Sequence, residues 1–261
     1  MAASKKTGGL AGVTAGKTEL CTVGQEGAGL TYRGYDIYDL VDQASFEEVA
    51  YLLLHGKLPT RAELDGYINR LKSMRGLPDD LKTVLEMIPA DTHPMDVQRT
   101  GVSFLGNIEP EGDFANQAGT ADRLLACLPS ILLYWHRFHT DGTRIDTTTD
   151  DDSVAGHFLH MLHDKPPSEL HRKCLDTTLI LYAEHEFNAS TFAGRVITGT
   201  LSDMHSAVTG AIGALRGPLH GGANEAAMEL IQQYDNADDA TKGIHEKLAN
   251  KDLIMGFGHR V

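Results

Sequence analysis

Apolar residues recur at helical spacing along most of the chain, and short strand-like runs occur only near its start. Two runs, Glu19 to Val23 and Gly29 to Tyr32, flank a glycine-rich turn and predict a small β element within residues 17–35. Beyond it, apolar positions three and four residues apart predict helices almost throughout. No series of alternating strands supports a parallel sheet, so the pattern predicts a mainly α fold.

Local signals mark the ends of several predicted helices. Two capping boxes, Ser45-Phe-Glu-Glu48 and Thr60-Arg-Ala-Glu63, start helices that we expect to end at Gly56 and Gly76. Further helices are predicted to begin at Pro78, at His93-Pro94 and at Asp150-Asp-Asp-Ser153. The remaining helices are predicted over residues 120–139, 167–184, 189–200, 203–216, 222–234 and 239–249.

Small residues recur within the helices predicted over 194–216. They are Gly194, Gly199, Ala207, Gly210, Ala211, Gly213 and Ala214. Glycine inside a helix costs up to about 1 kcal/mol relative to alanine, and close contact between helices offsets that cost. We therefore expect tight helix packing here, either in the core or at a subunit interface.

Composition narrows the classes of partner. The chain has 261 residues, 41% of them hydrophobic, and a net charge of −13. This length and composition suffice for a core. Nucleic acid or an anionic membrane would need a basic face, so the net negative charge argues against either as the main partner. An anionic small substrate remains compatible, since a few local arginines can hold one.

The cysteines and the amino end point to a cytoplasmic protein. The chain has three cysteines, Cys21, Cys127 and Cys174. Their number is odd and they form no Cys-x-x-Cys pair, so we expect buried free thiols in a reducing compartment. No segment has signal-peptide character or the ~20 apolar residues of a membrane span. Residues 1–16 are expected to form a flexible lead.

Three histidines lie in segments rich in Gly, Asn or Pro, which are residues that shape a backbone around a ligand. The segments are Tyr-Ala-Glu-His185-Glu-Phe-Asn-Ala-Ser-Thr, Arg-Gly-Pro-Leu-His220-Gly-Gly-Ala-Asn-Glu and Ile-Met-Gly-Phe-Gly-His259-Arg-Val. Each alone has a plainer interpretation as a turn or helix-end histidine. Together they suggest three imidazoles gathered around one substrate.

His220 has the most specific chemistry of the three. It precedes a predicted helix, whose positive amino-terminal end disfavours a cationic imidazole. A neutral imidazole can donate a hydrogen bond to a carbonyl that is becoming an enolate. The competing interpretation is an ordinary turn histidine before a helix.

Other histidines invite a metal hypothesis, which we consider the weaker one. His157, His160 and His163 fall three residues apart on one predicted helix, but apolar residues separate them and no carboxylate stands at ligand spacing. We therefore expect a structural role and no bound metal. The chain also has no Walker A loop, Gly-x-Ser-x-Gly elbow or His-Glu-x-x-His motif.

Taken together, the segments resemble the citrate synthase family over nearly the whole chain. Besides the His185 segment, the matching motifs are Leu30-Thr-Tyr-Arg-Gly-Tyr-Asp-Ile37, His55-Gly-Lys-Leu-Pro59, Gly217-Pro-Leu-His-Gly-Gly-Ala-Asn224 and Gly256-Phe-Gly-His259. Within the family, the chain is most similar to the 2-methylcitrate synthase branch. The features of that branch are His93-Pro-Met-Asp-Val97, Tyr134-Trp-His136, Thr149-Asp-Asp-Asp-Ser153 and Gly156-His-Phe-Leu-His160.

The resemblance implies a multi-helical homodimer of two-domain subunits. Residues 17–220 would form the large domain, still incomplete, and residues 221–261 would begin the small CoA-binding domain. Helices near residues 190–216 would lie at or close to the dimer interface. The implied enzyme is an acyltransferase of propionate catabolism, which condenses propionyl-CoA with oxaloacetate and water to give 2-methylcitrate and CoA.

The resemblance also implies residue roles. His220 would stabilise the enol of the acyl-CoA, His259 would hydrogen-bond the oxaloacetate carbonyl, and His185 would bind oxaloacetate. Arg70, or alternatively Arg75, would contact substrate. The residues expected against CoA are Leu253, Ile254, Met255, Gly256 and Phe257. No cofactor is expected to stay bound, since CoA enters as propionyl-CoA and leaves as product.

Family members continue beyond the position that matches Val261. That further part carries the aspartate base and most of the arginines that hold the dicarboxylate. The resemblance therefore implies an amino-terminal fragment, in which the contribution of general-base catalysis, about 10²–10⁴-fold, is missing.

Three alternatives stay open at this point. A citrate synthase that uses acetyl-CoA differs by one methylene of substrate, worth only about 1–3 kcal/mol in a pocket. A non-enzymatic helical dimerisation fragment would fit the small-residue helices. A histidine metal-binding protein is the third.

Overall fold

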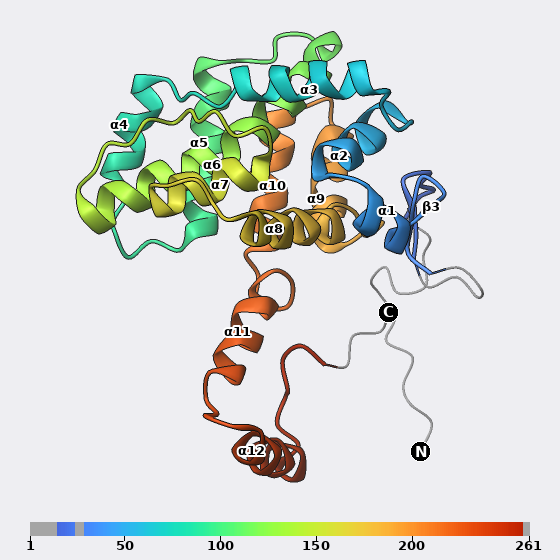
Figure 1. The fold of residues 1–261 in the computed structure, drawn as a ribbon, viewed down its shortest axis with the longest axis vertical. Helices are drawn as coiled ribbons and strands as arrows, with labels where there is room; N and C mark the ends of the chain where they lie inside the picture. Colours follow the sequence, from blue (N-terminus) through green and yellow to red (C-terminus); the bar gives the residue numbers. More distant parts are fainter. Residues whose placement is uncertain (1–14, 24–28, 258–261) are drawn as a thin grey trace.

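The computed structural model describes residues 15–23 and 29–257, and nearly all of its regular structure is helical (Figure 1). The helices are α1 (Ile37–Gln43), α2 (Phe46–His55), α3 (Arg61–Ser73), α4 (Asp79–Met87), α5 (Pro94–Ile108), α6 (Gln117–Asp141), α7 (Val154–His163), α8 (Glu169–Tyr182), α9 (Ala189–Thr198), α10 (Met204–Leu215), α11 (Gly222–Ile231) and α12 (Ala237–Asn250). A 3₁₀ helix, Phe114–Asn116, precedes α6. The predicted mainly α fold with a small β element near the amino end is confirmed. Of the expected lead over residues 1–16, residues 1–14 lie outside the described residues.

The β element is a three-stranded antiparallel sheet. Strands β1 (Cys21–Thr22), β2 (Thr31–Tyr32) and β3 (Tyr35–Asp36) follow one another in chain order, with Cys21 opposite Tyr32. The turn between β2 and β3 needs left-handed backbone at Arg33 (φ 47°) and Gly34 (φ 89°). The third strand, β3, adds a second antiparallel pair to the two predicted strand-like runs.

Most predicted helix ends are found, because the signals behind them are local. Both capping boxes are formed, at Ser45 with Glu48 and at Thr60 with Glu63. Gly56 ends α2 in the left-handed conformation, with φ 83°. The helix expected to end at Gly76 ends earlier, at Ser73. Helix α1 is an addition to the predicted elements, and the Asp36 side chain caps its start by accepting a hydrogen bond from the Tyr38 amide.

The core consists of two apolar clusters on either side of α6. One joins the sheet, α1, α2 and α3 to α8, and its members include Tyr32, Leu52 and Ile180. The other joins α4 and α5 to α6, and includes Leu85, Leu105 and Ile131. Burial of such side chains contributes about 1.5–3 kcal/mol each, so these clusters hold the helical body together.

The small residues of α9 and α10 permit close packing within this chain. A methyl group at Gly210 would overlap Cδ1 of Ile197 on α9, and one at Gly194 would lie 3.6 Å from the Ala207 carbonyl oxygen on α10. On the other side of α10, a methyl group at Gly106 of α5 would lie 2.7 Å from Cβ of His205. These contacts confirm the tight helix packing expected over 194–216, and place it between α5, α9 and α10.

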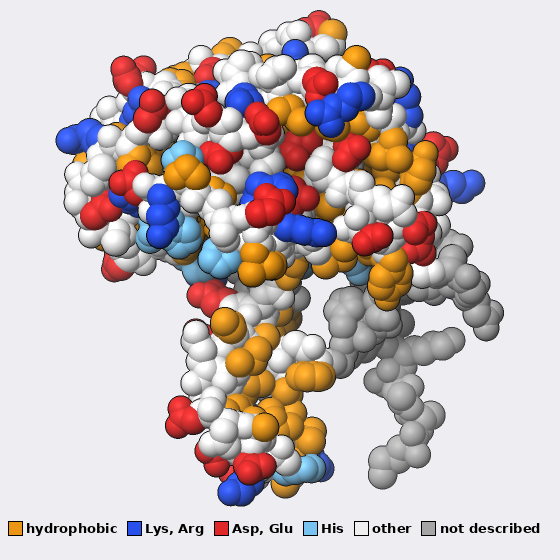
Figure 2. Space-filling view, viewed as in Figure 1, with side chains coloured by type: hydrophobic (Ala, Val, Ile, Leu, Met, Phe, Trp, Pro, Cys, Tyr) orange, Lys and Arg blue, Asp and Glu red, His pale blue; other side chains and the backbone are white. Residues whose placement is uncertain are grey.

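Helices α11 and α12 extend away from the helical body as an arm (Figure 1). Neither helix contains a buried residue. Apolar side chains gather on one side of the arm (Figure 2). The exposed apolar residues in this region are Leu219, Met228, Ile231, Leu248, Leu253 and Phe257.

Two further predictions concern cysteines and membranes. Cys21 and Cys127 are buried, as expected, but Cys174 is exposed on α8 because it faces away from the core. Within the described ranges, no helix is long and apolar enough to span a bilayer.

Candidate active site

The backbone around His220 is folded into a tight turn between α10 and α11. His220 donates its amide N–H to the Gly217 carbonyl at 2.9 Å, and Gly222 donates to the same oxygen at 3.2 Å. Gly221 has ordinary helical angles, φ −61° and ψ −32°, so glycine is not needed there for its dihedrals. It is needed for space, because a methyl group would lie 2.5 Å from the Leu215 carbonyl oxygen. Close backbone approach therefore sets the position of His220.

The His220 imidazole meets the start of α9. Its Nε2 lies 2.9 Å from the Ser190 hydroxyl oxygen and 3.3 Å from the Ser190 amide nitrogen. Asn188 caps α9 and accepts from the Thr191 amide at 2.9 Å and from the Ser190 hydroxyl at 2.7 Å. The imidazole is thus held by a helix amino terminus that is itself fixed by its cap.

His185 lies in the connection between α8 and α9, five residues before Ser190, and is exposed. A second link comes from Asn224 on α11, whose amide donates to the Tyr182 hydroxyl at the end of α8 at 2.7 Å. The structure therefore brings the His220 turn and the His185 segment together at the junction of α8, α9 and α11.

The segment predicted to contact CoA follows α12. Gly256 is left-handed, with φ 90°, and a methyl group there would lie 3.3 Å from Cβ of Ala227 on α11. Residues 253–257 therefore return to the same helix that His220 precedes, with Leu253 and Phe257 exposed. His259 lies outside the described residues.

Arg70 is not brought to this site. Its Nε donates to Asp122 at 2.7 Å, and the side chain lines a separate cavity of about 570 Å³ together with His205. His205 begins α10, whereas His220 follows its carboxyl end, and ten residues of helix span about 15 Å. The cavity that Arg70 lines with His205 therefore lies at the opposite end of α10 from the His220 turn.

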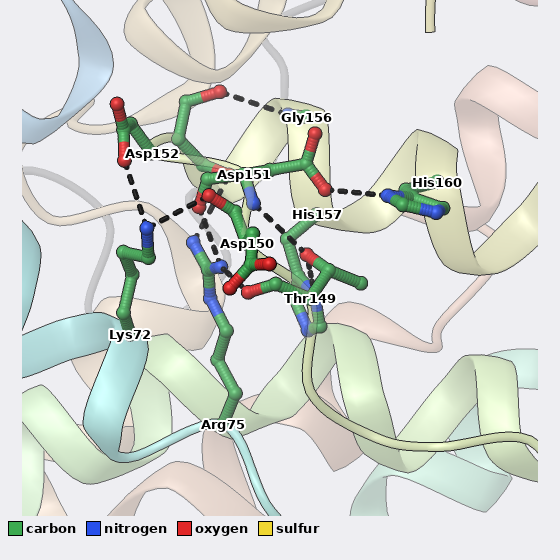
Figure 3. Close-up of polar contacts among 10 residues, drawn as sticks. Lys72, Arg75, Thr149, Asp150, Asp151, Asp152, Gly156, His157 and His160 are labelled. Carbon is green, nitrogen blue, oxygen red and sulfur yellow. Dashed lines mark hydrogen bonds and ion pairs between the residues drawn. The ribbon is translucent and has the colours of Figure 1, made fainter. Parts of the chain in front are cut away.

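Arg75, the alternative to Arg70, serves the fold instead. Its guanidinium is buried and donates to the carbonyl oxygens of Thr149 at 3.1 Å, Asp151 at 2.6 Å and Ser153 at 3.2 Å (Figure 3). These bonds shape the loop that leads into α7. The donors of Arg75 are thus committed to backbone carbonyls of its own chain.

Two histidines of α7, His157 and His160, contact the same loop (Figure 3). His157 is buried between Ser130 at 3.0 Å and Thr149 at 3.1 Å, and burial lowers its pKa to about 3. His160 pairs with Asp151 at 2.7 Å. Among residues 15–23 and 29–257, no three His, Cys, Asp or Glu side chains are grouped to hold a metal ion. The partners of His157 and His160 account for both as structural residues.

The structure adds site residues that sequence analysis does not assign. Ser190, Tyr182 and Asn224 connect the His220 turn to the His185 segment. All three stand inside the motifs already quoted, where the chain pattern indicates only helix caps and turns. Their contacts join residues 30 and 42 positions apart, which no local pattern specifies.

The site therefore combines a histidine turn, a second histidine segment on the helical body and a glycine-containing segment that packs on the protruding helix α11. This arrangement on a helical fold suits an acyl-transfer enzyme, and comparison with known proteins identifies the family. Residues 9–261 match the family model described as "Citrate synthase, C-terminal domain". The chain belongs to the citrate synthase family.

Individual relatives agree with this assignment. The chain is 64% identical over 260 residues to a 2-methylcitrate synthase of Shewanella oneidensis, covering 99% of this chain and 69% of that protein. It is 44% identical over 254 residues to a 2-methylcitrate synthase of Mycobacterium tuberculosis, covering 97% of this chain but 64% of that protein. The chain therefore spans about two thirds of the length of these curated relatives.

Solved structures of the family share the fold. A citrate synthase of Thermotoga maritima superimposes with a TM-score of 0.85 at 34% identity, over 97% of this chain and 67% of that one. A citrate synthase of Thermoplasma acidophilum, solved with carboxymethyl coenzyme A and oxaloacetate, gives a TM-score of 0.88 at 31% identity, over 96% of this chain and 66% of that one.

Proposed function

We propose that the whole protein is a 2-methylcitrate synthase, which condenses propionyl-CoA with oxaloacetate and water to give 2-methylcitrate and CoA. The observation that carries this proposal is the placement of His220. It stands between the His185 segment and α11, the helix on which residues 253–257 pack. The name shared by the relatives in Shewanella and Mycobacterium supports the choice of substrate.

The contacts of His220 suit a hydrogen-bond donor to a thioester carbonyl. Both printed contacts of the His220 ring use Nε2, which leaves Nδ1 for the substrate. We assign the ring proton to Nδ1 in the complex, with Nε2 accepting from Ser190. Nδ1–H is then available to the carbonyl oxygen of propionyl-CoA. As the α-proton passes to the aspartate base that the family resemblance implies, negative charge grows on that oxygen, and a fixed donor stabilises it more than it stabilises the ground state.

Oxaloacetate would lie on the other side of the acyl group. We place His185 against it, and we keep His259 as the partner of its reacting carbonyl, where a hydrogen bond draws electron density from the carbon under attack. The enol carbon then bonds to that carbon, and hydrolysis of the thioester releases CoA. Arg70 is left out of this proposed site, because it lies at the other end of α10.

Residues 253–257 are proposed to lie against CoA. The turn at Gly256 and the exposed side chains of Leu253 and Phe257 offer backbone donors and apolar surface to a nucleotide thioester. We further propose that α11 and α12 begin the small domain, with residues 17–220 in the large one. A homodimer, a cytoplasmic location and the lack of a permanently bound cofactor stay predictions.

The first experiment is a CoA-release assay on the whole protein, with oxaloacetate and propionyl-CoA. Replacement His220→Gln should lower kcat about 10²–10³-fold, the usual cost of removing one oxyanion donor. His171→Gln, an exposed histidine on α8, is the matched control and should leave the rate unchanged. A wild-type rate that survives His220→Gln would refute the role of His220.

A citrate synthase that prefers acetyl-CoA is the second candidate, favoured by a relative in Mycolicibacterium smegmatis that carries that name at 44% identity. The ratio of kcat/KM for propionyl-CoA and acetyl-CoA decides between them. We expect the ratio to exceed one, by the roughly 10–200-fold that a methylene is worth in a fitted pocket. A ratio below one would assign the protein to acetyl-CoA.

A further inference from the structure

The residues on both sides of His185 are held by the small sheet at the start of the chain. Cys21 on β1 is buried, and its sulfur accepts the Glu186 amide N–H at 3.0 Å. The same thiol donates to the Glu184 carboxylate at 3.4 Å. One side chain thus bridges the residue before His185 and the residue after it.

Tyr32 on β2 contacts the same loop. Its hydroxyl, fully buried, donates to the Ile180 carbonyl in the last turn of α8 at 2.9 Å. It also accepts the Glu184 amide N–H at 3.4 Å. Because Cys21 and Tyr32 are opposite each other in the β1–β2 pair, both contacts come from one rigid piece of sheet.

The loop between these contacts is strained. Glu186 has a left-handed backbone, with φ 55°, a conformation that disfavours a residue with a side chain. Its carboxylate accepts the Val23 amide N–H at 3.3 Å, which adds a bond to the residue directly after β1. Such a conformation persists only where surrounding contacts fix it.

We propose that Cys21 and Tyr32 are positioning residues for His185: they fix the backbone on either side of it and so aim its imidazole at oxaloacetate. The inference rests on the proposed function, since it takes His185 as an oxaloacetate ligand. It assigns the amino-terminal sheet, which carries none of the proposed contacts to substrate, a role in the geometry of the site.

The chemistry of the two side chains agrees with this role. Burial, followed by the nearby Glu184 charge, raises the pKa of the Cys21 thiol to about 12. Burial likewise raises the pKa of the Tyr32 hydroxyl to about 12. Both groups therefore stay protonated at neutral pH, and each acts as a donor and an acceptor at once.

The test compares Cys21→Ala and Tyr32→Phe with Cys21→Ser, which keeps a donor and an acceptor at the same position. Tyr38→Phe and Cys174→Ala, both exposed, are the matched controls. Oxaloacetate binding is measured by calorimetry. The ¹⁵N resonances of the His185 imidazole, assigned through His185→Gln, and amide exchange at Glu184 and Glu186 are measured on the same samples without substrate.

We expect Cys21→Ala and Tyr32→Phe to weaken oxaloacetate binding about 3- to 10-fold, the usual worth of one such hydrogen bond. In these two variants the His185 resonance should move and amide exchange at Glu184 and Glu186 should accelerate. Cys21→Ser should largely restore the wild-type resonance position and exchange rates. A merely structural role would lower Tm but leave the His185 resonance of the folded protein in place. Unchanged affinity and an unchanged resonance in both variants would overturn the proposal.

Failure of the proposed function gives a different result. If the wild-type protein does not bind oxaloacetate, the assignment of His185 as its ligand fails for every variant alike. The resonance and exchange measurements then still decide whether Cys21 and Tyr32 hold the loop. Should Tyr32→Phe fail to fold, Cys21→Ala with Cys21→Ser carries the test alone.

Discussion

At the scale of single residues, the proposed site depends on space as much as on chemistry. Gly221 follows His220, and the Leu215 carbonyl lies where its side chain would be. Gly217, four residues earlier, is less crowded, since a methyl group there would lie 3.4 Å from the Ala214 carbonyl oxygen. The two glycines of this turn thus differ in the space they leave for a side chain.

Replacement Gly221→Ala should displace His220, because the backbone of the turn must move to relieve the 2.5 Å contact. We expect the loss of activity to approach that of His220→Gln, with a kcat about 10²-fold lower, since a donor misplaced by an ångström is largely lost. The CoA-release assay measures this, with Gly217→Ala as the control. Equal rates for both alanine variants would show that the crowding at residue 221 does not position His220.

Glu47 lies far from the site but controls how stability depends on pH. It is buried, and its carboxylate accepts the Val154 amide N–H at 2.7 Å. Burial raises its pKa from 4.5 to about 7. The folded state therefore binds this proton more tightly than the unfolded state does. The resulting stabilisation is complete below pH 4.5 and is lost as the pH rises through about 7.

Replacement Glu47→Gln removes this titration and keeps an oxygen for the Val154 amide. The difference in unfolding free energy between variant and wild type should grow in favour of the variant from about pH 5 to about pH 8, by on the order of 3 kcal/mol. Urea unfolding at several pH values measures it. The comparison cancels His157, whose lowered pKa makes stability fall at acid pH in both proteins. Glu246→Gln, at an exposed position on α12, is the matched control.

Single residues also show which roles can be predicted from the sequence and which cannot. The histidine segments can be identified from the chain alone, because glycine and asparagine stand beside them. The buried roles of Tyr32 and Arg75 cannot, because their partners lie 148 and 78 residues away, at Ile180 and Ser153. The residues around Tyr32 indicate a strand and a turn, and only tertiary contact shows what the Tyr32 hydroxyl binds.

At the scale of elements, the helices can be predicted wherever a local signal specifies them. Capping boxes at Ser45 and Thr60 and the proline at Pro94 fix helix starts through contacts within one turn. Helix α1 escapes prediction because it is only seven residues long and directly follows a strand. The small residues of α9 and α10 correctly indicate close packing. Which helices pack there depends on tertiary structure.

Gly210 on α10 and Ile197 on α9 are in contact, so substitutions at these two residues should compensate each other. A methyl group at Gly210 would overlap Cδ1 of Ile197, the atom that Ile197→Val removes. Gly210→Ala alone should gain helix propensity but lose packing, at a cost of about 1–3 kcal/mol for the overlap. In the Ile197→Val background the overlap is gone, so the same change should stabilise by up to about 1 kcal/mol. A double-mutant cycle from urea unfolding measures the coupling, and additive effects would contradict a contact between these two residues.

At the scale of the whole molecule, the proposed site lies where the arm meets the body. In addition to the contact of His220 with Ser190, Asn224 on the arm contacts Tyr182 at 2.7 Å and Glu225 contacts His93 at 3.1 Å. Helices α11 and α12 leave their apolar residues exposed (Figure 2). An apolar face of this kind is typical of a surface that further protein covers. A site at this junction combines residues of a rigid body with residues of the arm.

The homodimer is the remaining prediction at this scale, and α9 offers a way to test it. Val196 on α9 and Leu201 just after it are exposed, 54% and 76%, beside helices that the family resemblance places near the interface. We expect the whole protein to sediment as a dimer. Val196→Glu would bury a charge in the interface and should raise the dimer dissociation constant by at least about tenfold. Met87→Glu, at another exposed apolar position at the end of α4, should not change it. A dimer that tolerates the glutamate at residue 196 would place the interface elsewhere, and the exposed apolar side of the arm would then be the next surface to test.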